Sequence, residues 1–277
     1  MWRFGSHSLR CGERTHVMGI LNVTPDSFSD GGRFFDPEDA VWEGLAMVEA
    51  GADLVDVGGE STRPGSDPVP VAEELRRVLP VVKRLAAEID APISIDTRRA
   101  EVARAALDAG AAVVNDITAG RDAEMFDVVR QADAGMVLMH MQGDPKTMQE
   151  EPRYDDVVRE VRAFLADRVA AAESTGIAPE RLCVDPGLGF GKTLQHNLVL
   201  IRDIGALSDI GRPILVGPSR KSFVGRITGA DVHERLEGTV GAVAWLVAKG
   251  AHVVRVHDVA AMVRVVRMVD AIRTAEG

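Results

Sequence analysis

The sequence predicts an α/β fold, a (β/α)8 barrel in which eight parallel strands alternate with helices. One phrase recurs: small residues end a helix, a Gly follows, and an apolar run leads into polar residues. It occurs at 49–60, 108–118, 132–142 and 248–259. The apolar runs are uninterrupted, which is typical of parallel strands buried on both faces. Eight such runs occur along the chain, and helix-period segments separate them.

The elements alternate in order. Besides the runs within the four repeats, strands are predicted at 16–24, 92–97, 181–187 and 213–219. Helices are predicted at 37–50, 68–89, 99–109, 122–131, 152–175, 196–208, 231–249 and 258–274. Pro37, Pro68 and Pro152 mark helix starts, and Asp36 and Asp67 precede two of them as caps. A doubly wound open sheet is the competing architecture; the count of eight and the lack of a proper phosphate fingerprint favour the barrel.

The first residues lie outside the eight units. The stretch "WRFGSHSLRCGE" has a Gly-Ser pair between two short segments, which predicts a hairpin at the N-terminal mouth of the barrel. There is no linker or low-complexity segment. Residues 1–277 are therefore expected to form a single TIM-barrel domain with a short N-terminal hairpin.

Composition excludes several classes of partner. A net charge of −10 and few aromatic residues disfavour binding to nucleic acid or to acidic membrane surfaces. No apolar run is long enough for a secretory signal or a membrane span, so a cytoplasmic protein is expected. The two cysteines, Cys11 and Cys183, offer no disulfide framework, and Cys183 is expected to be a small buried side chain within a strand.

The stretch "DPGLGFGKT" at 185–193 is similar to a nucleotide-binding loop but does not match one. A phosphate-binding loop ending at Lys192 and Thr193 requires a Gly where Pro186 stands. The glycines are also spaced G-x-G-x-G, not G-x-G-x-x-G. The stretch is therefore expected to serve another purpose, with an Asp at a strand end and a Phe within the loop.

Polar residues at the strand ends predict the site, because barrel enzymes carry their chemistry there. Asp96, Asn115 and Asp185 suit a flat heterocycle that is rich in N–H donors. A second group suits an anion and consists of Arg63, Lys221, Arg255 and His257. The mouth is thus expected to hold a pocket of hydrogen-bond acceptors beside a rim of cationic side chains.

The four residues of this second group come from three different strand ends and converge on one mouth, which suits a phosphate that Arg binds in bidentate fashion. From the residues alone, structural roles remain open. Asp96 and Asp185 would also serve as helix caps, and Arg255 with His257 as a surface pair. His140 is expected to be a packed strand-end histidine.

The motifs resemble those of the dihydropteroate synthase family. They are "GILNVTPDSFSDGG", "DVGGESTRPG", "SIDT", "VVND", "DPGLGFGKT", "GPSRKSF" and "VVRVHDV". They stand in that family's order and cover nearly the whole chain. The resemblance implies a transferase of folate biosynthesis that joins p-aminobenzoate to the pyrophosphate ester of 6-hydroxymethyl-7,8-dihydropterin and releases pyrophosphate.

The resemblance also implies the roles of single residues. Asp96, Asn115, Asp185 and Lys221 would read the pterin, and Arg255 would stack on it and contact the anion. Asn22 would serve Mg²⁺ and pyrophosphate, and Arg63 and His257 would bind pyrophosphate. The residues implied around the p-aminobenzoate or the pterin are Phe28, Thr62, Pro64, Met139, Phe190, Gly217 and Ser222.

This chemistry implies a loose, cation-like (SN1-like) transition state, because charge spreads into the pterin as pyrophosphate leaves with help from Mg²⁺.

A homodimer is expected, and sensitivity to sulfonamides is left open. Three alternatives remain. They are a pterin-binding methyltransferase of corrinoid systems, an aldolase with Lys221 as Schiff base, and a non-catalytic pterin binder.

Overall fold

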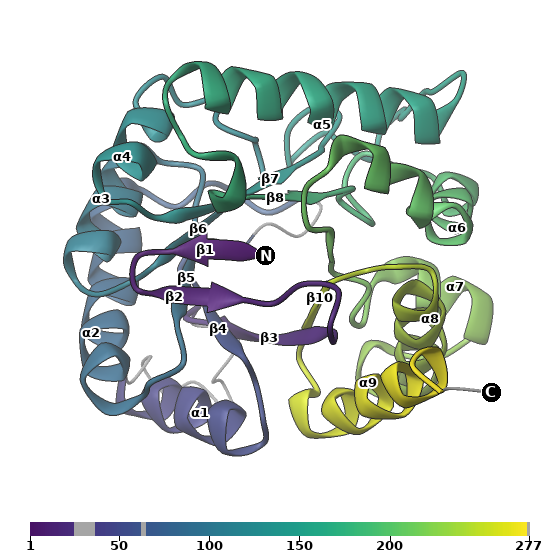
Figure 1. Ribbon diagram of the computed structural model, residues 1–277, viewed down its shortest axis with the longest axis horizontal. Helices are drawn as coiled ribbons and strands as arrows, with labels where there is room; N and C mark the ends of the chain where they lie inside the picture. The colour runs from purple at the N-terminus through teal and green to yellow at the C-terminus, as the bar shows by residue number, and fades with distance from the viewer. Residues whose placement is uncertain (25–36, 62–64, 276–277) are drawn as a thin grey trace.

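The computed structural model describes residues 1–24, 37–61 and 65–275. Eight parallel strands form one sheet, with helices around it (Figure 1). The strands are β3 (His16–Asn22), β4 (Leu54–Gly58), β5 (Ile93–Asp96), β6 (Val113–Asp116), β7 (Gly135–Met139), β8 (Leu182–Asp185), β9 (Leu215–Val216) and β10 (Val253–Val256). Their order is β8-β7-β6-β5-β4-β3-β10-β9. A parallel bridge from Val184 to Ile214 joins the two ends, so the predicted barrel is confirmed.

The helices are α1 (Pro37–Glu49), α2 (Val71–Glu88), α3 (Ala100–Asp108), α4 (Met125–Gln131), α5 (Val157–Ser174), α6 (Leu194–Arg202), α7 (Ser222–Thr228), α8 (Leu236–Ala248) and α9 (Val259–Arg273). Their buried faces pack on the outside of the strands and form the larger core. None of the helices in the described part of the chain is long and apolar enough to cross a membrane.

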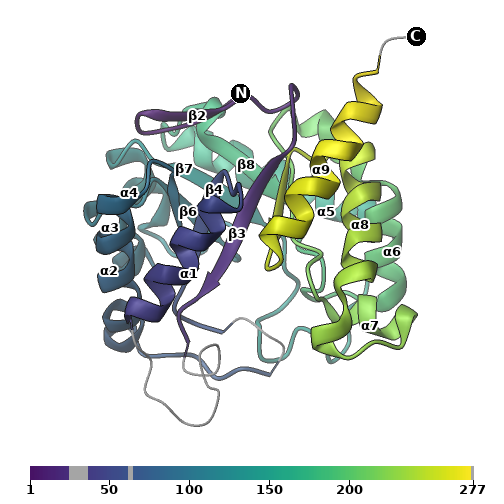
Figure 2. The same ribbon diagram turned by 90° about the horizontal axis from the view of Figure 1, so that it is seen from below.

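The N-terminal hairpin closes the end of the barrel at which the strands begin, as predicted (Figure 2). It consists of β1 (Trp2–Phe4) and β2 (His7–Leu9). Trp2 and Phe4 are fully buried against the inward side chains of the strands, Cys183 among them. The indole Nε1 of Trp2 donates to the carbonyl of Arg181, 2.9 Å away. The hairpin therefore covers the end of the barrel at which the strands begin, and the opposite end is left for the site.

Two predicted helix starts were wrong. Helix α2 begins at Val71, because Pro70 disfavours helical backbone at the residue before it. Asp67 therefore caps no helix, and its carboxylate pairs with Lys146 Nζ at 2.8 Å. Helix α5 begins at Val157, where Asp156 is the cap, so Pro152 lies in the irregular segment before the helix.

Other boundaries differ because tight turns occupy the predicted ends. Residues 204–210 and 232–234 form 3₁₀ turns beside α6 and α8, and helix α7 was not predicted. The chain between β9 and β10 therefore holds two α-helices where one was expected. The predicted cap Asp36 lies outside the described residues.

Candidate active site

The predicted site residues that the structure describes gather at the carboxyl ends of the strands. Asn22, Asp96, Met139 and Asp185 are the last residues of β3, β5, β7 and β8, and Asn115 is the third residue of β6. The others are Gly217 after β9, Phe190 in the loop after β8, Lys221 and Ser222 at the start of α7, Arg255 in β10 and His257 after it. Phe28, Thr62, Arg63 and Pro64 lie outside the described residues.

Arg255 lies at the centre of a buried charge network. Its Nε donates to Asp56 Oδ2 at 2.6 Å, and its Nη2 donates to Asp96 Oδ2 at 2.7 Å. Asn115 Nδ2 donates to the same Asp56 oxygen at 2.9 Å. Arg255 and His257 are therefore not a surface pair. The guanidinium is held by two carboxylates, and Asp96 is engaged by a cation and caps no helix.

Sequence reasoning missed Asp56. It lies inside β4, two residues before the strand ends, so attention to strand ends alone passes over it. The available signal was a single carboxylate between Val55 and Val57 in an otherwise apolar run, since a fully buried Asp requires a partner.

Burial changes the acid–base behaviour of the two predicted acceptors. It raises the pKa of Asp96 to about 7, against the lowering effect of Arg255 and with a raising contribution from Asp56. It raises the pKa of Asp185 to about 6, partly offset by the hydrogen bond that Asp185 Oδ1 accepts from Gly187 N at 2.7 Å. N–H donors of a bound ligand would therefore stabilise the ionised forms of both carboxyl groups.

His257 is not a cation in the free protein at neutral pH. Burial, with Arg255 and Arg220 nearby, lowers the pKa of His257 to about 3. Its Nδ1 lies 3.0 Å from Ser219 Oγ. Arg220 has a left-handed backbone and pairs with Asp258 at 3.0 Å, so that side chain is engaged beside the mouth. The cationic part of the rim in the described residues is thus Arg255 with Lys221.

The glycine-rich loop packs on the end of β7, which explains its spacing. Gly187 has a φ of +68°, and a Cβ there would lie 2.0 Å from the carbonyl oxygen of His140. Gly191 has a φ of +59°, and a Cβ there would lie 2.5 Å from the Gln142 oxygen. Only glycine allows this approach. The loop presents Phe190, whose ring centre lies 4.1 Å from Lys221 Nζ.

A buried lysine fixes this loop from behind. Lys192 Nζ donates to the carbonyl of Phe190 at 2.9 Å and lies 3.0 Å from His140 Nδ1. Burial and Lys192 lower the pKa of His140 to about 3, so His140 is neutral and its Nδ1 accepts a hydrogen bond from Lys192. His140 is therefore a packed residue, as predicted. Phe190 clusters with Ile117 and Met139 beneath the mouth.

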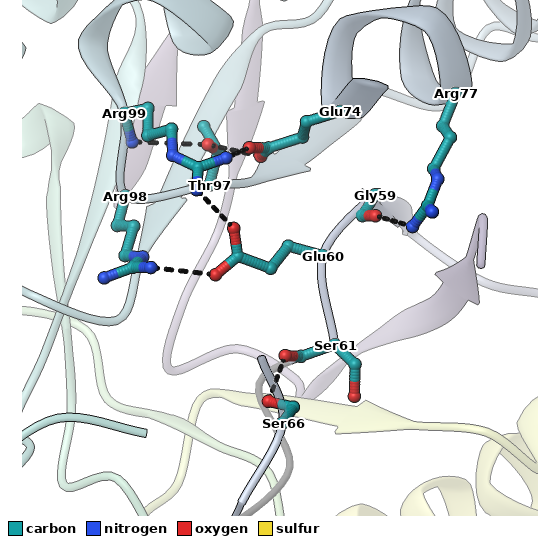
Figure 3. A network of polar contacts seen from close by, with 9 residues as sticks. All are labelled: Gly59, Glu60, Ser61, Ser66, Glu74, Arg77, Thr97, Arg98 and Arg99. Atoms are coloured by element: carbon teal, nitrogen blue, oxygen red, sulfur yellow. Dashed lines mark hydrogen bonds and ion pairs between the residues drawn. The ribbon is translucent and has the colours of Figure 1, made fainter. Parts of the chain in front are cut away.

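A second polar network holds the chain that precedes residues 62–64 (Figure 3). Glu60 pairs with Arg98 at 3.0 Å and with Arg99 at 2.9 Å. Arg99 also pairs with the buried Glu74, which accepts from Thr97 Oγ1 at 2.7 Å. The chain after β4 and the chain after β5 are thereby tied together directly beyond Asp96.

The described residues hold no group of three His, Cys, Asp or Glu side chains that could bind a metal ion. Asn22 is half-buried at the end of β3 and offers one amide oxygen. A single oxygen at the mouth fits Mg²⁺, which keeps several waters and takes further ligands from substrate phosphates.

Comparison with known proteins agrees with this geometry. The family model described as "Pterin binding enzyme" matches residues 18–257. A dihydropteroate synthase of Synechocystis sp. is 48% identical over 94% of this chain and 91% of its own length. That of Escherichia coli K12 is 46% identical over 94% and 93%.

Solved structures agree as well. A dihydropteroate synthase of Xanthomonas albilineans with 4-aminobenzoic acid superimposes with a TM-score of 0.90 at 48% identity, covering 95% of this chain and 94% of that one. A structure of the enzyme from the same organism with 7,8-dihydropteroate gives 0.86 at 45% identity, covering 95% of each chain. The barrel is that of the dihydropteroate synthase structures, and the chain belongs to the family of pterin-binding enzymes. Within it, the chain is a member of the dihydropteroate synthases.

Proposed function

We propose that this chain joins 6-hydroxymethyl-7,8-dihydropterin pyrophosphate to p-aminobenzoate, forming 7,8-dihydropteroate and pyrophosphate. The observation that carries the proposal is the set of acceptors Asp96, Asn115 and Asp185, the last two buried, around Arg255 at the carboxyl end of the barrel. Relatives of this chain bind 4-aminobenzoic acid and 7,8-dihydropteroate in the same fold.

The acceptors would bind the amino group and ring nitrogens of the pterin. Each raised carboxyl pKa falls when N–H donors arrive, because the donors stabilise the ionised form. Arg255 supplies a planar face for the ring. Phe190, with Lys221 over its ring, would form a wall of the neighbouring p-aminobenzoate position.

The reaction needs no covalent nucleophile from the protein. Pyrophosphate leaves from a CH₂ on an electron-rich ring, so positive charge spreads into the pterin and the amine of p-aminobenzoate attacks the cation. Lys221 and Arg255 would stabilise the departing anion, and the neutral His257 would donate a hydrogen bond to it. Mg²⁺, held by Asn22 and the substrate's phosphates, would neutralise part of the charge on the leaving group. Arg63 would add a further contact.

We also propose a cytoplasmic homodimer. Cys11 and Cys183 are free thiols, as is usual in reducing compartments. Large apolar side chains are exposed on α7, α8 and α9, namely Ile227, Trp245, Met268 and Ile272, and such surfaces favour association. Light scattering after size-exclusion chromatography tests this, and a single mass near 29.7 kDa would contradict it.

The deciding experiment measures pyrophosphate release from the dihydropterin ester with Mg²⁺, with and without p-aminobenzoate. Release that rises with p-aminobenzoate and yields dihydropteroate supports the proposal, and a sulfonamide added to the same assay determines drug sensitivity. Tight pterin binding without release favours a binder or a methyl-transfer partner. A borohydride-trapped adduct at Lys221 would favour the aldolase alternative.

A further inference from the structure

Asp56 is a fully buried carboxylate in the middle of the site's scaffold. It stands opposite Ile20 of β3 and Ser94 of β5, one layer deeper in the barrel than Asp96. Because side chains alternate along a strand, Asp56 shares the inward face with Leu54, which packs in the core next to the N-terminal hairpin. A buried carboxylate at this depth is costly, so it is expected to have a specific role.

The bonding of Asp56 is uneven. Its Oδ2 accepts from Asn115 at 2.9 Å and from Arg255 at 2.6 Å. Its Oδ1 is buried and has no hydrogen-bond partner among the described residues. An apolar residue would avoid the cost of that unpaired oxygen. The presence of Asp56 is therefore better explained by the two side chains that its Oδ2 holds, Asn115 and Arg255, than by a gain in the stability of the fold.

The first consequence concerns Asn115. An ionised carboxylate only accepts, so the Asn115 side chain must turn its NH₂ toward Asp56. Its Oδ1 is then the atom left for a ligand. Asp56 thus makes Asn115 an acceptor, the type of group that a donor-rich heterocycle requires.

The second consequence concerns Arg255. Asp56 holds its Nε and Asp96 holds its Nη2, so two nitrogens of one rigid plane are anchored from two strands. A pterin donor that engages Asp96 competes with Nη2 for that carboxylate. The bond to Asp56 keeps the guanidinium in place during this exchange.

We propose that Asp56 is a positioning residue for the pterin, which fixes the Asn115 amide with its oxygen toward the ligand and holds the plane of Arg255. This inference rests on the proposed function, and Asp56 is expected to act through these two side chains.

The experiment titrates wild-type protein and the Asp56→Asn variant with pteroic acid by calorimetry and measures KM for both substrates. Asp56→Asn is expected to raise the Kd for pteroic acid and the KM for the pterin substrate at least about tenfold, as for loss of charge-assisted bonds. The KM for p-aminobenzoate is expected to stay within about twofold, because the hydrogen bonds of Asp56 in the described part of the chain go to Asn115 and Arg255, which are assigned to the pterin. A wild-type Kd for pteroic acid in Asp56→Asn would overturn the inference.

Ser94→Ala is the matched control. Ser94 is buried, lies in register with Asp56 on the next strand, and has a hydroxyl with no hydrogen-bond partner among the described residues. It contacts neither Asn115 nor Arg255 through a hydrogen bond in that part of the chain. Its Kd for pteroic acid is expected to match the wild type. A loss equal to that of Asp56→Asn would mean that any polar change in this layer disturbs the barrel, and would overturn the assignment.

A pair exchange keeps the test decisive if Asp56→Asn folds poorly. Asn115→Asp places two carboxylates together and is expected to weaken pteroic acid binding. The double variant Asp56→Asn/Asn115→Asp restores the hydrogen bond with its direction reversed and is expected to bind more tightly than Asn115→Asp. A double variant weaker than Asn115→Asp would overturn the inference. Wild-type protein that neither binds pteroic acid nor makes dihydropteroate would instead refute the proposed function.

Discussion

Arg255 Nη2 and Asp96 Oδ2 lie 2.7 Å apart, although β3 and β4 separate their strands in the sheet. The bond spans the mouth of the barrel, because the Arg side chain rises from a deeper layer past Asp56. Arg255 and Asp96, which are both assigned to substrate binding, therefore form an ion pair with each other in the free protein. Substrate binding is an exchange of partners within a charge network that is already formed.

Replacing Arg255 with Ala is expected to destabilise the protein by about 3–5 kcal/mol, because two buried carboxylates lose their cation. It is also expected to weaken both pterin and pyrophosphate binding. Urea unfolding at several pH values measures the first effect. The deficit is expected to be smaller at pH 5 than at pH 8, since protonation of Asp96 removes the unpaired charge.

The exposed pair of Arg202 with Asp203 provides the control for that variant. Arg202→Ala is expected to leave the free energy of unfolding nearly unchanged, because exposed ion pairs contribute little. An Arg255→Ala deficit that does not vary with pH would contradict the network as described. Weaker binding of only one of the two ligands, pterin or pyrophosphate, would contradict the dual role of Arg255.

Asp185→Asn is expected to weaken pteroic acid binding about tenfold or more, because a buried acceptor of N–H donors is replaced by an amide. The KM for p-aminobenzoate is expected to change much less. Calorimetry and substrate kinetics measure the two effects, with the exposed Asp203→Asn as control. An unchanged affinity for pteroic acid would refute the assigned role.

Pterin binding is expected to strengthen as pH rises from 5.5 to 8. In the free protein, Asp96 and Asp185 hold protons that the unfolded chain has already released, since their pKa values are raised to about 7 and about 6. These groups therefore lower stability as pH rises from about 4 to about 7. Bound N–H donors favour the ionised forms and reverse that loss. The gain in Tm on adding pteroic acid is expected to be larger at pH 8 than at pH 5.5, and a constant gain would contradict this.

Gly187→Ala is expected to destabilise the protein by about 3 kcal/mol or more and to weaken p-aminobenzoate binding through Phe190. The added Cβ meets the His140 carbonyl. Gly229→Ala separates clash from backbone strain, because Gly229 has a similar φ of +74° with nothing within 4 Å of its Cβ position. Equal losses of unfolding free energy in the two variants would show that the close approach contributes nothing.

Removing divalent cations with EDTA is expected to abolish pyrophosphate release, because the leaving group loses its counter-charge. The Kd for pteroic acid, which carries no phosphate, is expected to remain within about twofold. Added Mg²⁺ is expected to restore release. Full release in EDTA would remove Mg²⁺ and the role of Asn22 from the mechanism.

Much of the fold could be predicted because its signals are local. Uninterrupted apolar runs and glycines after helices identified the strands that form the barrel, and the Gly-Ser turn located the hairpin. Helix starts at Pro68 and Pro152 were wrong, because a Pro is as compatible with extended chain as with a first helical turn.

The site could be predicted in part. Strand-end residues such as Asp96 and Asp185 follow from the rule that barrel sites form at one end of the strands. Asp56 was missed and His257 was assigned to the cationic rim. Both errors have one cause, since pairing and burial depend on neighbours that are far away in the chain.

The sequence by itself determined the class of fold, the family and the end of the barrel that carries the site, because periodicity and motifs are properties of neighbouring residues. Only the tertiary structure decided that Arg255 bridges Asp56 and Asp96, that Asn115 Nδ2 donates to Asp56, and that the pKa of His257 is lowered to about 3. The reason is physical: charge state and hydrogen-bond direction depend on desolvation and on partners from other strands, and closure of the barrel brings both together.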